Sequence, residues 1–447
     1  MRRALGILVA SAVASASVAI GAAGAAPAAR HRATPGVTAT TIRVGGLASP
    51  PNVLNVPYQD GYEGAKAYFE IVNKKGGVFG KKLELVAQLS DQGSPGGNIR
   101  AVRSLVEEKH VFAVLPVMTN SFAGAKYLAD HEIPTFGIDV DPGWCGTISE
   151  VEAMQDRILS GDLSPQCPRQ SLFGEKGSFL CFRCPNPGPS FILLRKHVTR
   201  AAIFTYTHPS STLCAAGLEA SFRMYGIDVV FEDKTLNFGF SDASADAQGV
   251  RENGAEAIAT CMDFGGAFRL AQQLKNAGAK DLIVLAPEGY RPSTVEKYGK
   301  ALNGWFFGVF FTPWEVKDPP KGTRAYLQAM KKRGVSPSEQ SQAGWINAQL
   351  LVEGIKKAGK SFTRRSVIDA INSIDDFTAD GILANVNWTS TGSGHGLESG
   401  PTRAACAAYV EAVNGRFVPR FGKPGRPFVC FPYGPLPATL DDPIYRP

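Results

Sequence analysis

The chain has 447 residues, of which 44% are hydrophobic and 19% are charged, and its 47 Lys and Arg against 40 Asp and Glu give a formal net charge of +7. These charges are spread along the chain without a basic block, which excludes the pattern of a nucleic-acid-binding protein. A chain of this length exceeds one hydrophobic core of ordinary size, so we expect two domains.

The first 25 residues have the pattern of an export signal. Arg2 and Arg3 precede a long apolar run rich in Ala, and the small residues Ala23-Gly24-Ala25 fit a cleavage site. A run of this length could also span a bilayer as an uncleaved anchor, but its Ala, Ser and Gly content is unlike a Leu-rich span. We therefore expect residues 1–25 to be a signal peptide and the mature protein to lie in the periplasm, the cell envelope or outside the cell.

Between residues 41 and 141, short apolar runs alternate with segments in which apolar residues recur at helical spacing. The expected strands cover residues 42–48, 82–89, 111–117 and 133–138, and the expected helices cover residues 58–77, 96–109 and 121–131. Apolar strands separated by amphipathic helices are typical of a parallel sheet with helices on both faces. This part of the chain is therefore predicted to be a doubly wound α/β lobe.

The same alternation resumes between residues 200 and 287. The expected strands cover residues 200–207, 228–233, 255–263 and 281–287, and the expected helices cover residues 211–226, 241–253 and 266–278. This pattern predicts a second α/β lobe of similar size.

Three further parts of the chain break or follow this alternation. Residues 142–189 hold four cysteines with several Pro and Gly, which predicts a loop-rich insertion braced by disulfides. Helical spacing returns near residues 323–333, 341–358 and 363–374. The Pro-rich tail from Arg416 onward is predicted to be extended.

Three segments of the chain together resemble those of a known protein family. "EGAKAYFEIVNKKGGVFGKKLELV", "LADHEIPTFGI" and "GAEAIATCMDFGGAFRLAQQLKNAGAKDLIVLAPEGY" occur in this order. In order and spacing they resemble the branched-chain amino-acid (leucine, isoleucine and valine) binding proteins of ABC transporters, which are type I periplasmic binding proteins. The resemblance spans most of residues 41–414, apart from the Cys-rich insertion.

The resemblance implies an α/β fold of two doubly wound parallel-sheet lobes joined by a three-segment hinge. The first lobe would comprise residues 41–141 and 312–388. The second lobe would comprise residues 190–311 and 389–447, the latter including the Pro-rich tail.

The resemblance also implies a function. The chain would be an exported solute-binding protein, not an enzyme, that closes its lobes on a small polar organic ligand, an amino acid or a derivative. It would deliver this ligand to an ABC permease in the membrane. We expect a monomer without a cofactor.

Two other functions stay open. Two-lobed domains of this kind also present ligands to signalling receptors, so an extracytoplasmic sensor is the main alternative. An exported hydrolase is a weaker one, because the chain has no G-x-S-x-G, H-E-x-x-H or P-loop motif. The glycine-rich stretch around His395 has low specificity, and we expect His395 to lie in a surface loop.

Glu288 is the strongest candidate ligand-binding residue. In open α/β sheets the ligand crevice lies at the carboxyl ends of the strands, and Glu288 directly follows an expected strand. In the amino-acid-binding relatives, a Gly-Pro-Glu-Gly loop at this place supplies a carboxylate to the ligand's ammonium group; here the loop is Ala286-Pro287-Glu288-Gly289. A Pro-x-Gly turn with a solvated Glu is the alternative.

The carboxylate of an amino acid needs a site of its own. The family uses a Ser/Thr-rich turn that opens a helix after the third strand, where free N–H groups and the helix dipole favour an anion. Here the turn makes Thr119, Asn120 and Ser121 the candidates, and an ordinary helix N-cap is an equal alternative.

Acidic residues near this turn distinguish the chain from its relatives. Asp139 and Asp141 approach the same corner of the site, and Asp263 lies near a position where relatives use a tyrosine. A ligand without a carboxylate, or with a second cationic or hydroxyl group, fits such a corner better than an amino acid. Tyr58 is expected to form a wall of the pocket.

Tyr290 and Trp314 are weaker candidates for the pocket wall. For these aromatic side chains, as for Tyr58, packing in the core is the alternative to ligand contact.

All eight cysteines lie in the exported part, so disulfides are expected. If the second lobe has the strand order 2-1-3-4, Cys214 and Cys261 both lie at its carboxyl edge, and we predict a disulfide between them. Cys406 and Cys430 flank a hairpin with an Asn-Gly turn and are predicted to pair.

The pairing of the remaining four cysteines stays open among three connectivities: Cys145, Cys167, Cys181 and Cys184. Cys181 and Cys184 have the spacing of a redox motif or half of a zinc site. Export favours a disulfide over either, so no metal site is predicted.

Overall fold

The computed structural model describes residues 34–50, 56–177, 179, 181–390, 392–396, 404–432 and 438–447. The expected signal peptide, residues 1–25, lies outside the described residues. None of the helices in the described part of the chain is long and apolar enough to span a bilayer.

The first sheet consists of five parallel strands in the order β2-β1-β3-β4-β5. Its strands are β1 (Thr41–Ala48), β2 (Lys82–Ser90), β3 (Ala113–Met118), β4 (Thr135–Gly137) and β5 (Leu172–Gly174). The connecting helices are α1 (Asp60–Lys74), α2 (Pro95–Arg103) and α3 (Ala125–Asp130). Every residue of β3 is buried, which explains why its sequence is a continuous apolar run rather than an alternating one.

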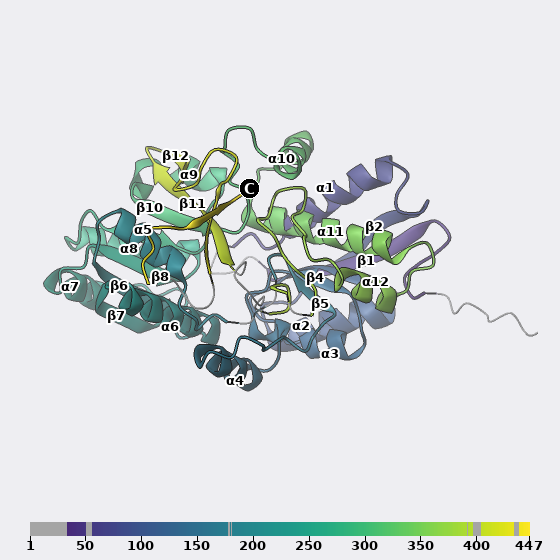
Figure 1. Ribbon diagram of the computed structural model, residues 1–447, viewed down its shortest axis with the longest axis horizontal. Helices are drawn as coiled ribbons and strands as arrows, with labels where there is room; N and C mark the ends of the chain where they lie inside the picture. The colour runs from purple at the N-terminus through teal and green to yellow at the C-terminus, as the bar shows by residue number, and fades with distance from the viewer. Residues whose placement is uncertain are drawn as a thin grey trace, which may run out of the picture. The chain divides into compact units, whose positions relative to one another are not determined.

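Three later helices return to this sheet. They are α10 (Lys321–Arg333), α11 (Glu339–Ala358) and α12 (Arg364–Ile371). Helix α11 packs along α1 and contacts β3, β4 and α12, and Figure 1 shows it beside α1. The two helices approach closely at glycines, since a Cβ on Gly64 would lie 1.7 Å from the carbonyl oxygen of Ser341.

The second sheet has the order β14-β13-β11-β10-β9-β8-β6-β7 among the described residues, and β12 pairs with β11. Its parallel strands are β6 (Arg200–Tyr206), β7 (Asp228–Leu236), β8 (Ala257–Cys261), β9 (Ile283–Ala286) and β10 (Trp305–Val309). Its helices are α5 (Pro187–Arg195), α6 (Pro209–Met224), α7 (Ser244–Glu252), α8 (Phe264–Asn276) and α9 (Pro292–Tyr298). Both sheets thus show the expected doubly wound α/β architecture, which is confirmed.

The chain's last strands extend the second sheet in the antiparallel sense. They are β11 (Ala404–Val413), β12 (Arg416–Arg420), β13 (Phe428–Pro432) and β14 (Ile444–Arg446). The β11–β12 hairpin turns at Asn414 and Gly415, both with positive φ. The described part of the Pro-rich tail is therefore extended, because it forms the strands β12, β13 and β14.

The Cys-rich insertion is more regular than the sequence analysis expected. It contains α4 (Ile148–Leu159), which begins with a capping box at Thr147, and β5, which pairs with β4 as the last strand of the first sheet. A three-residue strand is too short to produce a periodic pattern, so it was not recognisable in the sequence.

The expectation that His395 lies in a surface loop is wrong. Its side chain is 0% exposed, and its Nε2 lies 2.8 Å from Oδ1 of Asn372. His395 also contacts the rings of Phe173 and Trp388, so it packs as a core residue beside β5. Its Gly-rich neighbours gave no apolar pattern from which this burial could be predicted.

Candidate ligand-binding site

A pocket lies where the carboxyl ends of the parallel strands of both sheets converge. Its lining comes from the segments that follow β1, β3, β4 and β5 in the first sheet and β6 to β10 in the second, together with the start of α11. The cavity is about 300 Å³, a size at the lower end of sites for small organic ligands. The location matches the rule that ligands bind at the carboxyl edge of open α/β sheets.

Glu288 enters this pocket from the loop after β9. Its Oε2 accepts a hydrogen bond of 3.0 Å from the N–H of Phe264, the first residue of α8, and its Oε1 lies 3.8 Å from Arg291 Nη1. Burial, with the nearby charge of Asp263, raises the pKa of the Glu288 carboxyl, and Arg291 opposes this shift. The turn needs a glycine next, because Gly289 has φ +125° and a Cβ there would lie 2.4 Å from the Phe264 ring.

Asp263 caps helix α8 at the same end of the pocket. Its Oδ1 accepts the N–H of Gly266 at 3.1 Å, and its Oδ2 accepts the Tyr206 hydroxyl at 2.6 Å. Burial raises the pKa of Asp263, and the hydrogen bond from Tyr206 opposes this rise. Burial and the charge of Asp263 also raise the pKa of Tyr206, so its hydroxyl stays protonated and keeps donating to Asp263.

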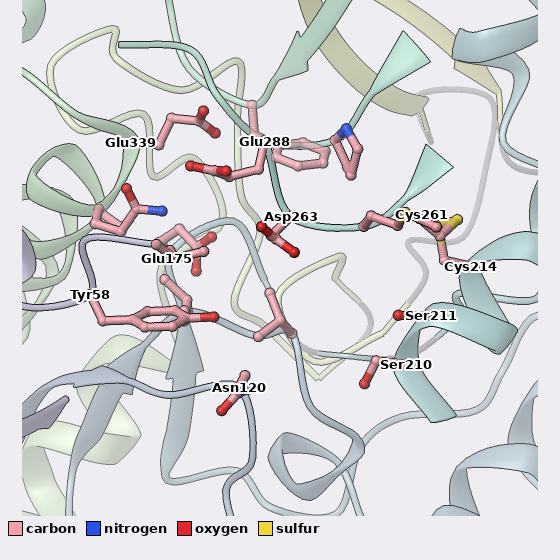
Figure 2. Close-up of a pocket in the computed structure, with 18 of the residues that line it drawn as sticks. Tyr58, Asn120, Glu175, Ser210, Ser211, Cys214, Cys261, Asp263, Glu288 and Glu339 are labelled. Atoms are coloured by element: carbon pink, nitrogen blue, oxygen red, sulfur yellow. A yellow bond between two sulfur atoms is a disulfide. The ribbon is translucent and has the colours of Figure 1, made fainter. Parts of the chain in front are cut away.

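Glu339 brings a third carboxylate from the first turn of α11. Its Oε1 accepts the N–H groups of Gly289 at 3.0 Å and Tyr290 at 2.7 Å, which ties α11 to the loop after β9. Burial and the charge of Glu288 raise the pKa of Glu339 to about 8. In the view of Figure 2, Glu288, Glu339 and Asp263 lie in the upper half of the pocket.

Glu175 and Lys176 enter the pocket from the segment after β5. Lys176 Nζ lies 2.5 Å from Asp139 Oδ1, 3.6 Å from Glu175 Oε1 and 4.7 Å from the centre of the Phe310 ring. Burial raises the pKa of Glu175 to about 7, although Lys176 lowers it. Burial opposes the charge of Lys176, but the carboxylates of Asp139 and Glu175 raise its pKa, so it stays charged.

The start of α6 borders the pocket on another side. His208 is the N-cap of this helix, and burial lowers the pKa of its imidazole, although the charge of Asp141 opposes this shift. Its Nδ1 accepts the N–H of Ser210 at 3.3 Å, and its carbonyl oxygen accepts those of Ser211 and Thr212. The first amides of α6 are thus already engaged.

A disulfide forms part of the pocket wall. Cys214 and Cys261 are joined with their Cα atoms 6.0 Å apart, and both residues line the cavity. Cys406 and Cys430 are joined across β11 and β13. These are the two pairs expected from the sequence. The insertion holds the pairs Cys145–Cys167 and Cys181–Cys184, the pairing that the sequence left open.

Four of the seven ligand-binding candidates from the sequence line the pocket: Tyr58, Asn120, Asp263 and Glu288. The other three do not line it. Thr119 directly follows β3 and is buried outside the lining. Ser121 lends its carbonyl oxygen to Asn98 Nδ2 at 3.0 Å. Asp141 caps a short helical turn through Gly143 N–H at 2.7 Å.

Tyr290 and Trp314 also lie outside the lining. Their rings stack with centres 4.4 Å apart, and the Tyr290 hydroxyl donates to Glu315. Two further lining residues, Glu175 and Glu339, were not predicted from the sequence. Glu175 follows the short strand β5, and Glu339 lies in a helix that returns from far along the chain, so neither was placed at a sheet edge by a sequence pattern.

The chain matches the family model described as "Periplasmic binding protein" over residues 13–155 and 188–415, more than half of its length. The chain belongs to this family. The gap between the matched ranges falls in the Cys-rich insertion. No protein of curated function matches the chain in sequence.

Solved structures show the same type I periplasmic binding fold. The substrate-binding protein LivJ of a branched-chain amino acid transporter from Streptococcus pneumoniae, solved with isoleucine, has a TM-score of 0.64 at 16% identity, covering 85% of this chain and 98% of its own. The leucine-binding protein LivK from Thermotoga maritima has a TM-score of 0.63 at 15% sequence identity. The match covers 85% of this chain and 98% of LivK. A solute-binding protein from R. palustris, solved with benzoate, has a TM-score of 0.61 at 14% sequence identity. The match covers 85% of this chain and 95% of that protein. At these identities the likeness establishes the fold, not the ligand.

Proposed function

We propose that this periplasmic binding protein is exported, binds a small polar organic ligand in the pocket at the strand edges, and delivers it to an ABC permease. The ligand class that we propose is an amino acid or a derivative that bears an ammonium group. The observation that supports this most is the position of Glu288, whose carboxylate faces a pocket formed by segments of both sheets.

The electrostatics of the pocket support an ammonium ligand. Glu288, Asp263 and Glu339 meet at one end, and burial raises the pKa of each carboxyl. A cation placed among them relieves their mutual repulsion, and charge-assisted hydrogen bonds in a site shielded from water are stronger than exposed ones. Tyr206 and Tyr58 also line the pocket, and the Tyr206 hydroxyl donates to Asp263.

Binding is expected to proceed by a shift between conformations of the two lobes. A ligand that contacts residues after strands of both sheets stabilises the state in which all these contacts form at once. The permease would then recognise that state.

A thermal-shift screen of the mature, oxidised protein tests this function. The compounds are amino acids, amides, polyamines, short-chain acids and aromatic acids. A ligand at about 100 times its dissociation constant stabilises the folded state by about 2.7 kcal/mol, which raises the melting temperature measurably. Stabilisation by a compound with an ammonium group supports the proposal, whereas no response to any class contradicts a solute-binding function.

A further inference from the structure

The charged side chains around the pocket are mostly carboxylates. Among the described residues that line it, the charged or titratable groups other than tyrosine and the paired cysteines are Glu175, Asp263, Glu288, Glu339, Lys176 and His208. Lys176 is already paired with Asp139 and Glu175, and burial lowers the pKa of His208, which disfavours its charged form. The described lining therefore has no unpaired cation that could bind the carboxylate of a ligand. It would instead place four acidic side chains near that carboxylate.

The starts of α6, α8 and α11, which border the pocket, offer no better anion site. The start of α8 is occupied by protein carboxylates, because Asp263 accepts Gly266 N–H and Glu288 accepts Phe264 N–H. At the start of α6, the first amides donate to the imidazole and carbonyl groups of His208. At the start of α11, Ser341 N–H donates to Ser338, and Glu339 itself faces the cavity. A second anion at any of these places would compete with an existing bond or approach a carboxylate.

The rest of the lining suits an apolar body. The aromatic members are Tyr58, Phe182, Tyr206, Phe238, Phe310 and Phe311, and the aliphatic ones include Ile138, Val140, Ile346 and Leu383. Aromatic faces attract cations as well as covering apolar groups. A cavity of about 300 Å³ limits the ligand to a small molecule.

We propose that the ligand is a small organic amine, cationic at neutral pH, that carries no carboxylate and has an apolar or aromatic body. This inference rests on the proposed solute-binding function. It narrows the ligand class from amino acids and their derivatives to derivatives that keep the ammonium group but lack the carboxylate. The ammonium group lies among Glu288, Glu339 and Asp263, and the body extends along the aromatic wall. The arrangement selects against an α-amino acid, since its carboxylate would lie within a few ångströms of these groups and would lack a counter-charge.

Calorimetric titration with two matched series tests this directly. Each series holds the body constant and changes only the charged groups: phenethylamine, phenylalanine and hydrocinnamate in one, and isoamylamine, leucine and isocaproate in the other. In at least one series the amine is expected to bind at least about tenfold more tightly than the amino acid, and the acid is expected not to bind. Tighter binding of the amino acid or the acid in both series overturns the inference but leaves the solute-binding function standing.

If none of the six compounds binds, the wider thermal-shift screen decides. An amine cation without a carboxylate as the stabilising compound supports the inference. A carboxylate-bearing compound as the best ligand overturns it. A screen without any stabilising compound contradicts the proposed function itself, so the two failures are distinguishable.

A pair of variants tests whether the negative charge of Asp263 makes the pocket prefer an amine to an amino acid. Asp263→Asn keeps the helix cap, because Asn and Asp are comparable N-caps. It is expected to reduce the ratio of amine to amino-acid affinity by about tenfold. Asp242→Asn is the matched control, since Asp242 also accepts a backbone N–H, from Ser244, but is exposed and away from the pocket. An unchanged ratio in Asp263→Asn contradicts the inference.

Discussion

Glu288 Oε2 accepts the backbone N–H of Phe264 at 3.0 Å, which fixes the loop after β9 to the first turn of α8. The other oxygen, Oε1, is 3.8 Å from Arg291 Nη1, beyond hydrogen-bonding distance. One oxygen of the carboxylate therefore holds it in place, while the other keeps hydrogen-bonding capacity toward the pocket. Such preorganisation lowers the entropic cost of binding a ligand.

Replacing Glu339 is expected to change how stability depends on pH. A carboxyl whose pKa rises from its ordinary value of 4.5 to about 8 on folding keeps its proton in the native state after the unfolded chain has lost it. The free energy of unfolding therefore falls as pH rises through this window. In the Glu339→Gln variant, the amide oxygen can still accept the N–H groups of Gly289 and Tyr290. Because Gln does not ionise, this variant does not lose stability in this way as pH rises.

The melting temperatures of wild type and Glu339→Gln measure this effect between about pH 5 and pH 9. The variant's melting temperature relative to wild type is expected to increase steadily with pH. The groups that face Glu339 are Glu288, which raises its pKa, and Arg291, which lowers it. A difference that does not vary with pH would mean that Glu339 is already ionised at low pH.

Amine binding is expected to strengthen with pH. Burial raises the pKa of Glu175 to about 7 and that of Glu339 to about 8, so a cation must displace protons at lower pH. Lys176 and Asp139 face Glu175, and Glu288 faces Glu339. Titrations with phenethylamine between about pH 6 and pH 8, where an alkyl ammonium group stays charged, should give a falling dissociation constant. A dissociation constant that does not change across this pH range would mean that amine binding does not depend on the ionisation of these two carboxyls.

The two expected disulfides should differ in their effect on the pocket. Removing either by double substitution to Ser is expected to lower the free energy of unfolding by about 2–4 kcal/mol. Only the Cys214 and Cys261 pair lines the pocket, so its loss should also weaken ligand binding, while loss of the Cys406 and Cys430 pair should not. Denaturant unfolding and calorimetry measure the two effects; equal affinity in both variants would remove the disulfide from the site.

The contact between α1 and α11 should not tolerate a methyl group at Gly64. A Cβ there would lie 1.7 Å from the carbonyl oxygen of Ser341, so the helices must move apart. Gly64→Ala is expected to lower the free energy of unfolding by about 1–3 kcal/mol. Gly96→Ala in α2 is the control, because its added Cβ would meet only the flexible end of Arg100 at 3.4 Å. Equal stability of both variants would contradict this packing.

The sheet architecture was predictable because its signals are local and repeated. Apolar runs such as residues 113–118 alternate with amphipathic helices, and this rhythm defines two parallel sheets. It also places the ends of strands: Cys261 ends β8, Glu288 follows β9, and both line the pocket. The β11–β12 hairpin was predictable from its Asn-Gly turn, whereas β13 is less evident, because the prolines around it hide the strand pattern.

The composition of the site was only partly predictable. Thr119 and Asn120 are neighbours just after β3, but Asn120 lines the cavity whereas Thr119 is buried outside the lining. Glu175 and Glu339 reach the pocket through an insertion and a returning helix. Their place depends on packing between segments far apart in the chain, which no spacing in the sequence records.

The most direct measurement is the affinity of phenethylamine for Glu288→Gln and for Glu296→Gln, determined by calorimetry at one pH. Gln at position 288 can still accept the Phe264 N–H, so the fold should be kept, while the charge that faces the pocket is lost. Glu296 is an exposed residue of α9 outside the lining and is the matched control. Loss of one charge-assisted hydrogen bond, about 1.5–3 kcal/mol, predicts a dissociation constant at least about tenfold higher for Glu288→Gln alone. Equal dissociation constants for the two variants and wild type would show that Glu288 does not bind the ligand.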